Sequence, residues 1–348
     1  MATSNRIRRC GVTGGRRVRL VDVAREAGTS VSTVSRVLNG SEQISFEVSN
    51  HVRSVAARLG YRADGAAKEL KLGQVRTIGV TVPDLANPFF PEVLKGLGAG
   101  ARAAGHRLLI SESGEDPDEE LRLAEELTSH ASALVLCSSR LRPKHLARIL
   151  DGPIPVVCVN RTAKQAGVVC VDYRSGSRQL LDHLANLGHR RIAYVGGPPA
   201  SWSDGQRRRT LRTLTRKMGM QLAEITGGWS GDHGYDAGPE VLGIGATAVI
   251  TFNDLVAIGL LSWLHDTGVE VPGAVSVTSY DDIPIAAYAR PPLTSLRNQR
   301  AQLGRLAWDH LSARLAGDQW PQPVMLTPTL IVRASTGRPL ENGEADPA

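Results

Sequence analysis

The chain has 348 residues and a formal net charge of +7, with 42% hydrophobic and 22% charged residues. This length allows two or three domains with sizeable cores, and the composition is that of a folded globular protein. No apolar run approaches the roughly 18 residues of a membrane-spanning helix, and the polar, basic N-terminal residues are not followed by the apolar core of a signal peptide. Because Cys10, Cys137, Cys158 and Cys170 follow neither disulfide nor zinc spacing, we expect a reduced cytoplasmic protein with no metal and no cofactor.

The positive charge is concentrated in the first quarter of the chain. Residues 1–77 hold 14 Lys and Arg against 6 Asp and Glu, or +8, and residues 78–348 hold the remaining 27 against 28, or −1. A compact basic module on a neutral body is the electrostatic pattern of a protein that binds a polyanion. Charge alone fits a solvated basic tail equally well.

The first elements in chain order are short helices. Residues 1–17 hold almost no large apolar side chain and predict a disordered basic arm. Within residues 18–62, apolar spacing predicts three helices, the second N-capped by Ser30 and the third by Ser45. A tight turn at Gly28 joins the first two, which is typical of a helix-turn-helix domain. Residues 63–76 follow as a linker with a further short helix.

From residue 77 onward, short β-branched runs alternate with helical patterns. Helices are expected near residues 94–104, 119–130, 175–187 and 255–265, and strands at 77–82, 107–111, 133–137, 155–159, 191–195, 246–252 and 274–279. This alternation predicts parallel sheets covered by helices on both faces. Because residues 77–337 are too many for one small sheet, we predict two doubly wound lobes with a ligand cleft at the carboxyl ends of their strands.

Several blocks of sequence carry a family resemblance. The segment LVDVAREAGTSVSTVSRVLNG occupies residues 20–40, and PDLANPFF, GHRRIA, FND, YDDIP and VRASTG follow in order. Together these blocks resemble the LacI/GalR (lactose and galactose repressor) family over residues 18–337. The resemblance implies an all-α helix-turn-helix headpiece and an α/β body of two parallel-sheet lobes of periplasmic-binding-protein type. The implied lobes are residues 77–171 with 301–325 and residues 172–298 with 327–337, followed by a polar tail at 338–348.

The resemblance implies a set of DNA contacts. The second helix would place Val31, Ser32 and Arg36 against base edges in the major groove, where Val meets a thymine methyl and Arg grips guanine. Leu70 matches the leucine with which each hinge helix of the family wedges into the operator. Residues expected at phosphates are Arg19, Thr33, Ser35 and Asn39. Arg19 stands where the family usually has Thr or Ser, which predicts a helix start weaker by about 1 kcal/mol.

The resemblance also implies a small-molecule effector between the lobes. A buried Arg that faces carboxylates can hold hydroxyl groups or a carboxylate, and an aromatic face suits the C–H face of a sugar. Arg208 stays an alternative to Arg207, because RRRTL at residues 207–211 departs from the family pattern. The positions that match the family's effector contacts are Asp84, Phe89, Asn160, Arg207, Trp229, Asp254 and Asp281.

These features imply a cytoplasmic homodimer that binds a near-palindromic double-stranded DNA operator and represses transcription under the control of a small ligand, with a sugar favoured over a purine. Control by a protein co-regulator and a role as activator both stay open. A sugar-binding receptor or an enzyme on the same fold is less favoured. The resemblance implies a DNA-binding headpiece, and the sequence has no phosphate loop, nucleophile elbow or metal-ligand spacing.

Overall fold

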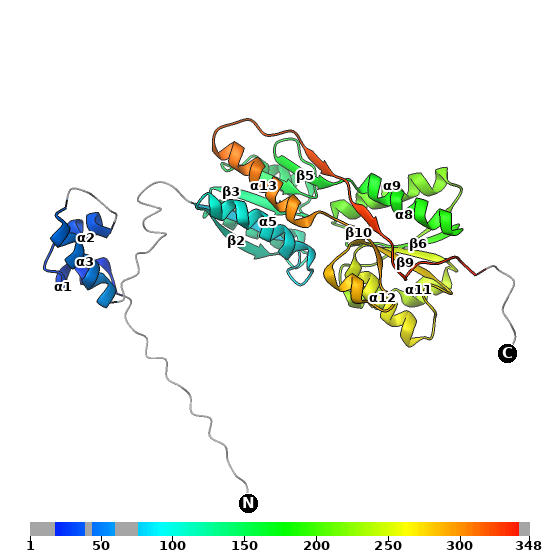
Figure 1. Cartoon of the computed structure of the whole chain (residues 1–348). Coiled ribbons are helices and arrows are strands. Elements are labelled where there is room, and N and C mark those ends of the chain that lie inside the picture. The colour runs from blue at the N-terminus through cyan, green and yellow to red at the C-terminus, as the bar shows by residue number, and fades with distance from the viewer. Residues whose placement is uncertain (1–17, 39–43, 60–75, 341–348) are drawn as a thin grey trace, which may run out of the picture. The chain divides into compact units, whose positions relative to one another are not determined.

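The computed structural model describes residues 18–38, 44–59 and 76–340. The chain forms two compact units, Met1–Val75 and Arg76–Ala348, so the division falls at the end of the predicted linker (Figure 1). The predicted basic arm, Asn39, Leu70 and nearly all of the predicted linker and tail lie outside the described residues.

The first unit contains a small helical core. Its described helices are α1 (Leu20–Glu26), α2 (Val31–Leu38) and α3 (Phe46–Arg58). Gly28 ends the first helix with φ +61°, a left-handed conformation that glycine adopts without a steric cost. One apolar face from each helix meets in the centre, and these contributions include the buried side chains of Val23, Val34, Val37, Val52 and Val55. The structure thus confirms the predicted helix-turn-helix bundle.

Two of the three helix starts of this unit differ from the sequence expectation. At α1 the Asp22 carboxylate accepts a hydrogen bond from the Arg19 backbone N–H at 2.9 Å, so an acidic side chain in the first turn reaches back to the helix start in the absence of Ser or Thr. At α2 the Ser30 hydroxyl accepts from the Thr33 N–H at 3.0 Å, as expected of an N-cap. Ser45 stands at the N-cap of α3 but makes no side-chain cap bond.

The second unit is built on two six-stranded sheets. The N-lobe sheet has the order β11-β5-β4-β3-β1-β2, and its paired strands are all parallel. Its strands are β1 (Thr77–Val82), β2 (Arg107–Glu112), β3 (Ala133–Cys137), β4 (Val156–Val159), β5 (Gly167–Val171) and β11 (Val324–Leu326).

The C-lobe sheet has the order β12-β10-β9-β8-β6-β7, and its pairs are parallel except that β12 runs antiparallel to β10. Its strands are β6 (Arg191–Val195), β7 (Gln221–Ile225), β8 (Ala248–Thr251), β9 (Ser276–Asp281), β10 (Thr294–Arg297) and β12 (Thr329–Ile331). The two parallel-sheet lobes predicted from the sequence are therefore present.

Helices cover both faces of each sheet. In the N-lobe, α5 (Phe89–Ala103) and α13 (Arg300–Leu315) pack on one face, and α6 (Pro117–Thr128) and α7 (Pro143–Leu150) pack on the other. In the C-lobe, one face carries α8 (Tyr173–Leu187) and α9 (Trp202–Lys217). The other face carries α10 (Gly231–Asp236), α11 (Gly238–Gly243), α12 (Asp254–Asp266) and a 3-10 turn at Pro284–Tyr288.

The chain passes between the lobes three times, between β5 and α8, between β10 and α13, and between β11 and β12. Helix α13 belongs to the N-lobe and packs against α5. This packing holds the N-lobe end of the connection between β10 and α13 in place. The two helices approach so closely that a Cβ atom at Gly96 would lie 2.0 Å from the Ala301 carbonyl oxygen. A Cβ atom at Gly304 would lie 2.0 Å from the Val93 carbonyl oxygen, so glycine is required on both helices.

This packing predicts the effect of adding one methyl group. Gly96→Ala places its Cβ against backbone that cannot rotate away, and we expect the free energy of unfolding to fall by about 1–3 kcal/mol. The matched control is Gly243→Ala, at an exposed helical glycine with no atom within 4 Å of the added Cβ. It should be neutral or gain up to about 1 kcal/mol. Urea unfolding of both variants checks this, and equal stabilities would contradict the close packing.

Candidate functional site

Helix α2 presents two distinct faces. Val34 and Val37 are buried in the core of the headpiece, whereas Val31 is 43% exposed and Ser32 and Arg36 are exposed. Thr33 and Ser35 lie between these extremes, half-buried. The exposed side chains at the start of α2, followed one turn later by an arginine, have the arrangement of a helix that reads base edges in a major groove.

The hydroxyl groups at the start of α2 are linked to one another. The Ser30 hydroxyl lies 2.7 Å from the Ser32 hydroxyl and 2.8 Å from that of Thr33, in addition to its cap bond. A hydroxyl both donates and accepts, so Ser32 and Thr33 keep capacity for a further partner. Arg19 is 64% exposed and lies 4.0 Å from the Asp22 carboxylate.

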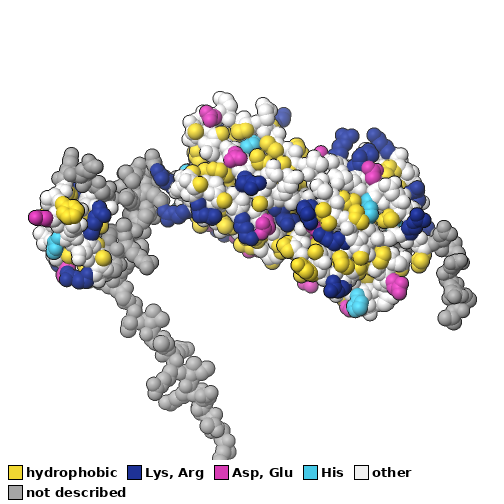
Figure 2. All heavy atoms as spheres, in the orientation of Figure 1, with side chains coloured by type: hydrophobic (Ala, Val, Ile, Leu, Met, Phe, Trp, Pro, Cys, Tyr) yellow, Lys and Arg dark blue, Asp and Glu magenta, His cyan; other side chains and the backbone are white. Residues whose placement is uncertain are grey.

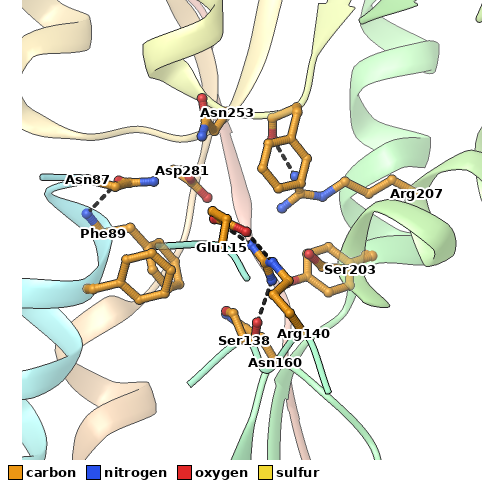
Figure 3. A pocket seen from close by; sticks show the side chains of 13 residues that line it. Asn87, Phe89, Glu115, Ser138, Arg140, Asn160, Ser203, Arg207, Asn253 and Asp281 are labelled. Atoms are coloured by element: carbon orange, nitrogen blue, oxygen red, sulfur yellow. Dashed lines mark hydrogen bonds and ion pairs between the residues drawn. The ribbon is translucent and has the colours of Figure 1, made fainter. Parts of the chain in front are cut away.

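A narrow cleft lies between the lobes of the second unit, and Figure 3 shows its lining from close by. Both lobes contribute polar and aromatic side chains to it. The lining residues are Asn87, Phe89, Phe90, Glu115, Ser138, Arg140, Asn160, Tyr173, Ser203, Arg207, Phe252, Asn253 and Asp281.

Backbone strain is concentrated at this cleft. Among the described residues, five that are not glycine have a left-handed backbone, and four of these line the cleft: Glu115 (φ 66°), Ser138 (φ 48°), Asn160 (φ 57°) and Asp281 (φ 107°). Each stands at or just after the carboxyl end of a strand. Such conformations cost on the order of 1–3 kcal/mol each and cluster at functional sites, where the surrounding structure holds them.

Arg207, on α9, provides the cationic side of the C-lobe wall. Its guanidinium group lies over the rings of Tyr280, Tyr173 and Phe252, with ring centroids at 4.1, 4.8 and 5.0 Å. The side chain is 4% exposed, and its Nη1 donates to the Phe252 carbonyl. Its Nε atom is buried without a hydrogen-bond partner among the described residues. Because Arg207 lines the cleft, its guanidinium places a positive charge and N–H donors at the ligand space.

Asp281 provides the anionic side of the same wall. Its Oδ1 atom accepts a hydrogen bond from the Asn298 side chain at 3.0 Å. Burial raises the pKa of Asp281, while Arg207 and Arg300 act in the opposite direction. Arg207 and Asp281 therefore offer a donor and an acceptor to the same space without bonding to each other in the described structure.

The N-lobe wall carries an ion pair. The Arg140 guanidinium grips the Glu115 carboxylate with two bonds, from Nη2 to Oε1 at 2.9 Å and from Nε to Oε2. Its Nη1 donates to the Ser138 carbonyl. Asn160 stands beside them and donates to the Ser138 hydroxyl at 3.4 Å. Both partners of the ion pair are almost fully buried, with side chains 3% and 5% exposed.

The structure brings together four of the seven residues expected at the effector, namely Phe89, Asn160, Arg207 and Asp281. The structure also distinguishes Arg207 from Arg208, the alternative that the sequence left open. Arg208 is outside the cleft lining and forms ion pairs with Asp204 at 2.6 Å and Glu224 at 2.8 Å.

The other three expected residues lie outside the cleft lining. Asp84 is half-buried, and its carboxylate accepts from the Ala86 N–H at 2.8 Å. The Trp229 ring packs on His233 with centroids 4.5 Å apart. Asp254 is fully buried and accepts from the Ser295 hydroxyl at 2.6 Å and the Ile283 N–H at 2.7 Å. It supports the turn after β9 from behind.

Nine lining residues were not expected from the sequence: Asn87, Phe90, Glu115, Ser138, Arg140, Tyr173, Ser203, Phe252 and Asn253. Several follow directly after predicted strands, and this position is the signal that could have found them. In the described part of the chain, no group of three or more His, Cys, Asp or Glu could hold a metal ion. There too, no helix is long and apolar enough to cross a membrane.

A helix-turn-helix unit followed by two lobes around a polar cleft defines a ligand-responsive class of DNA-binding protein. Residues 19–64 match the family model of bacterial regulatory proteins of the lacI family, and residues 181–336 match the periplasmic binding protein-like domain.

Individual relatives agree with these matches. The chain is 34% identical to the HTH-type transcriptional regulator GalS of Salmonella typhimurium, over 82% of this chain and 86% of that protein. It is 30% identical to the ribose operon repressor of Escherichia coli, over 90% and 98%. The crystal structure of the lac repressor dimer bound to operator and an anti-inducer matches with TM-score 0.80 and 26% identity, over 92% and 100%. The chain belongs to the LacI family and is a DNA-binding transcriptional regulator.

The exposed position of Arg36 predicts a DNA-binding phenotype. Arg36→Ala should weaken operator binding by roughly 1–3 kcal/mol and relax base preference at one position of each half-site. Arg25→Ala is the matched control, because Arg25 is also exposed and lies in the last turn of α1. Binding titrations against operator and scrambled DNA check this. If Arg36→Ala keeps the wild-type preference between the two DNAs, the arginine does not read bases.

The buried Asp254 predicts a pH dependence of stability. Burial raises its pKa to about 8, whereas an unfolded aspartate titrates near 4. At a pH between these two pKa values, Asp254 keeps its proton in the folded protein and has lost it in the unfolded chain. Stability therefore falls as the pH rises through this window, and the fall ends above the folded pKa.

Asp254→Asn cannot ionise, so its free energy of unfolding should fall less than that of the wild type between about pH 6 and about pH 8.5. Urea unfolding at both pH values measures this, and the comparison removes the contribution of groups that the two proteins share. Equal changes in the two proteins would show that Asp254 does not hold the proton.

Proposed function

We propose that the protein is a homodimeric repressor of transcription whose affinity for a near-palindromic operator is controlled by a sugar bound between the lobes. The observation that carries the proposal is the presence of Arg207 and Asp281 on the same C-lobe wall of the cleft. This wall carries a guanidinium donor and a carboxylate acceptor that do not bond to each other in the described structure. A hydroxyl group donates and accepts at once, so adjacent hydroxyls of a sugar satisfy both.

The walls of the cleft support a small polyhydroxy ligand, because polar and aromatic side chains both line it. Phe89, Phe90, Tyr173 and Phe252 supply aromatic faces for the C–H groups of a sugar ring. The ribose operon repressor and the operator-bound lac repressor dimer are relatives whose names support repression, a sugar effector and dimerisation.

DNA binding belongs to the first unit and sugar binding to the second. Any coupling between them is therefore a free energy that links the two binding equilibria. If the sugar changes operator affinity by some factor, operator DNA must change sugar affinity by the same factor. We place this activity in the cytoplasm, where a bacterial regulator reaches both the chromosome and imported sugars. Leu70, outside the described residues, stays our candidate for the operator wedge.

Substitutions in the cleft test the effector assignment. A thermal-shift screen of monosaccharides identifies a ligand, and calorimetry then measures its dissociation constant. Arg207→Ala and Asp281→Ala should each weaken binding by about 1–3 kcal/mol, because each leaves a ligand hydrogen bond unmade. Operator affinity without sugar should stay near normal.

Arg209→Ala is the matched control, since Arg209 lies on the exposed side of the same helix. Figure 2 shows that Lys and Arg side chains gather over α8 and α9, so this control also removes one charge from a basic surface. An unchanged sugar dissociation constant in both cleft variants would remove Arg207 and Asp281 from the effector site.

A further inference from the structure

The cleft contains a second arginine whose situation differs from that of Arg207. Arg140 is bound through both edges of its guanidinium group, to the Glu115 carboxylate and to the Ser138 carbonyl. An arginine has five N–H donors, and these bonds use three of them. One N–H on each Nη atom is left, and the side chain lines the cleft.

The geometry of this pair is fixed by the backbone around it. Glu115 follows Gly114, and both have left-handed backbones, with φ 66° and 59°. The Glu115 N–H donates to the Pro83 carbonyl at 3.1 Å, which ties the loop to the end of β1. Because Ser138 is also left-handed, the carboxylate and the carbonyl that hold Arg140 both come from strained strand ends. Groups held in this way meet a ligand without rearranging.

The Glu115 carboxylate is the ion-pair partner that balances the charge of Arg140. Two more ionisable side chains nearby are buried: the carboxyl group of Glu120, whose pKa burial raises, and the guanidinium of Arg161. The Glu120 carboxylate accepts from the Arg140 backbone N–H at 2.5 Å, and Arg161 donates to the Ser139 carbonyl at 3.0 Å. Removing the charge of Glu115 would therefore leave this wall with an excess positive charge, whatever the state of the C-lobe residues.

We propose that Glu115 and Arg140 form the N-lobe half of the effector site and make it select an uncharged sugar against the corresponding sugar acid. This inference rests on the proposed function, because it assigns specificity to the same cleft. The two remaining N–H groups of Arg140 donate to ligand hydroxyls, and the lone pairs of Glu115 accept from them.

An anionic ligand is disfavoured for two reasons. The Glu115 carboxylate, held by Arg140 through two bonds, already balances the charge of this guanidinium, so a ligand carboxylate meets no unbalanced cation there. The charge of Glu115, on a side chain that is 5% exposed, also repels a second carboxylate. Specificity of this kind works by penalising the wrong ligand as well as by binding the right one.

The test measures a ratio of affinities rather than a single affinity. Calorimetry at neutral pH compares galactose with galacturonate, glucose with gluconate, and ribose with ribonate, on the full-length protein. The wild type should bind at least one neutral sugar, and bind it at least about tenfold more tightly than its acid. Glu115→Gln keeps the shape of the side chain, frees Arg140 and should shift this ratio towards the acid by at least about tenfold.

Two further variants make the result decisive. Glu112→Gln is the matched control, since Glu112 is an exposed carboxylate at the end of β2, outside the cleft lining, and the ratio should not change. The double variant Glu115→Gln with Arg140→Gln removes both charges of the pair and leaves the net charge of the wall unchanged. It should bind the neutral sugar more weakly than the wild type does, without the shift towards the acid.

The outcomes separate the two proposals. If a neutral sugar binds the wild type but Glu115→Gln leaves the ratio unchanged, the specificity inference is wrong and the proposed function stands. A wild type that prefers the acid overturns the inference in the same way. If no sugar or sugar acid binds the wild type, the proposed function itself fails. If Glu115→Gln does not fold, the double variant tests the inference instead. A double variant that binds the neutral sugar with wild-type affinity would exclude Glu115 and Arg140 from the effector site.

Discussion

The turn at Asp281 and Asp282 is the point at which the cleft and the lobe connections meet. Both residues have left-handed backbones, and the turn is held in place by charge. The Asp282 carboxylate pairs with Arg297 and Arg333, each at 2.7 Å, and Arg300 donates to the carbonyl groups of both aspartates. Arg297 and Arg300 flank the passage between β10 and α13, and Arg333 follows β12, the strand that the last passage reaches. A ligand that contacts Asp281 therefore acts on the residues that join the lobes.

The N-lobe transmits this constraint through helix packing. Arg300 begins α13, and α13 lies against α5 at the contacts that Gly96 and Gly304 permit. Helix α5 in turn begins at Phe89, which lines the cleft. The connection from the C-lobe aspartates thus leads through two tightly packed helices to the opposite side of the ligand space. Packed interfaces of this kind shift between discrete arrangements rather than deforming gradually, which suits a switch.

The sequence predicted the parts of this arrangement that depend on local pattern. Strands such as β1 and β3 were found because their β-branched runs stand between helices. Strand β5 follows β4 without an intervening helix and was not expected, and β7 is a half-exposed edge strand with a mixed pattern. Glu115 and Arg140 were missed for a different reason. They meet because Glu115 and Ser138 adopt left-handed backbones, and no local pattern marks a non-glycine residue for that conformation.

The two arginines of the cleft show how one residue type serves two purposes. Arg207 is enclosed by aromatic rings, which offset part of the cost of burying a cation, and in the described structure it keeps a donor without a partner. Arg140 has its charge matched by Glu115 before any ligand arrives. The unmatched arginine provides a reason for a ligand to bind, since binding completes its hydrogen bonds. The matched arginine adds hydrogen bonds without adding net charge, so the N-lobe wall can recognise hydroxyl positions while the C-lobe wall supplies affinity.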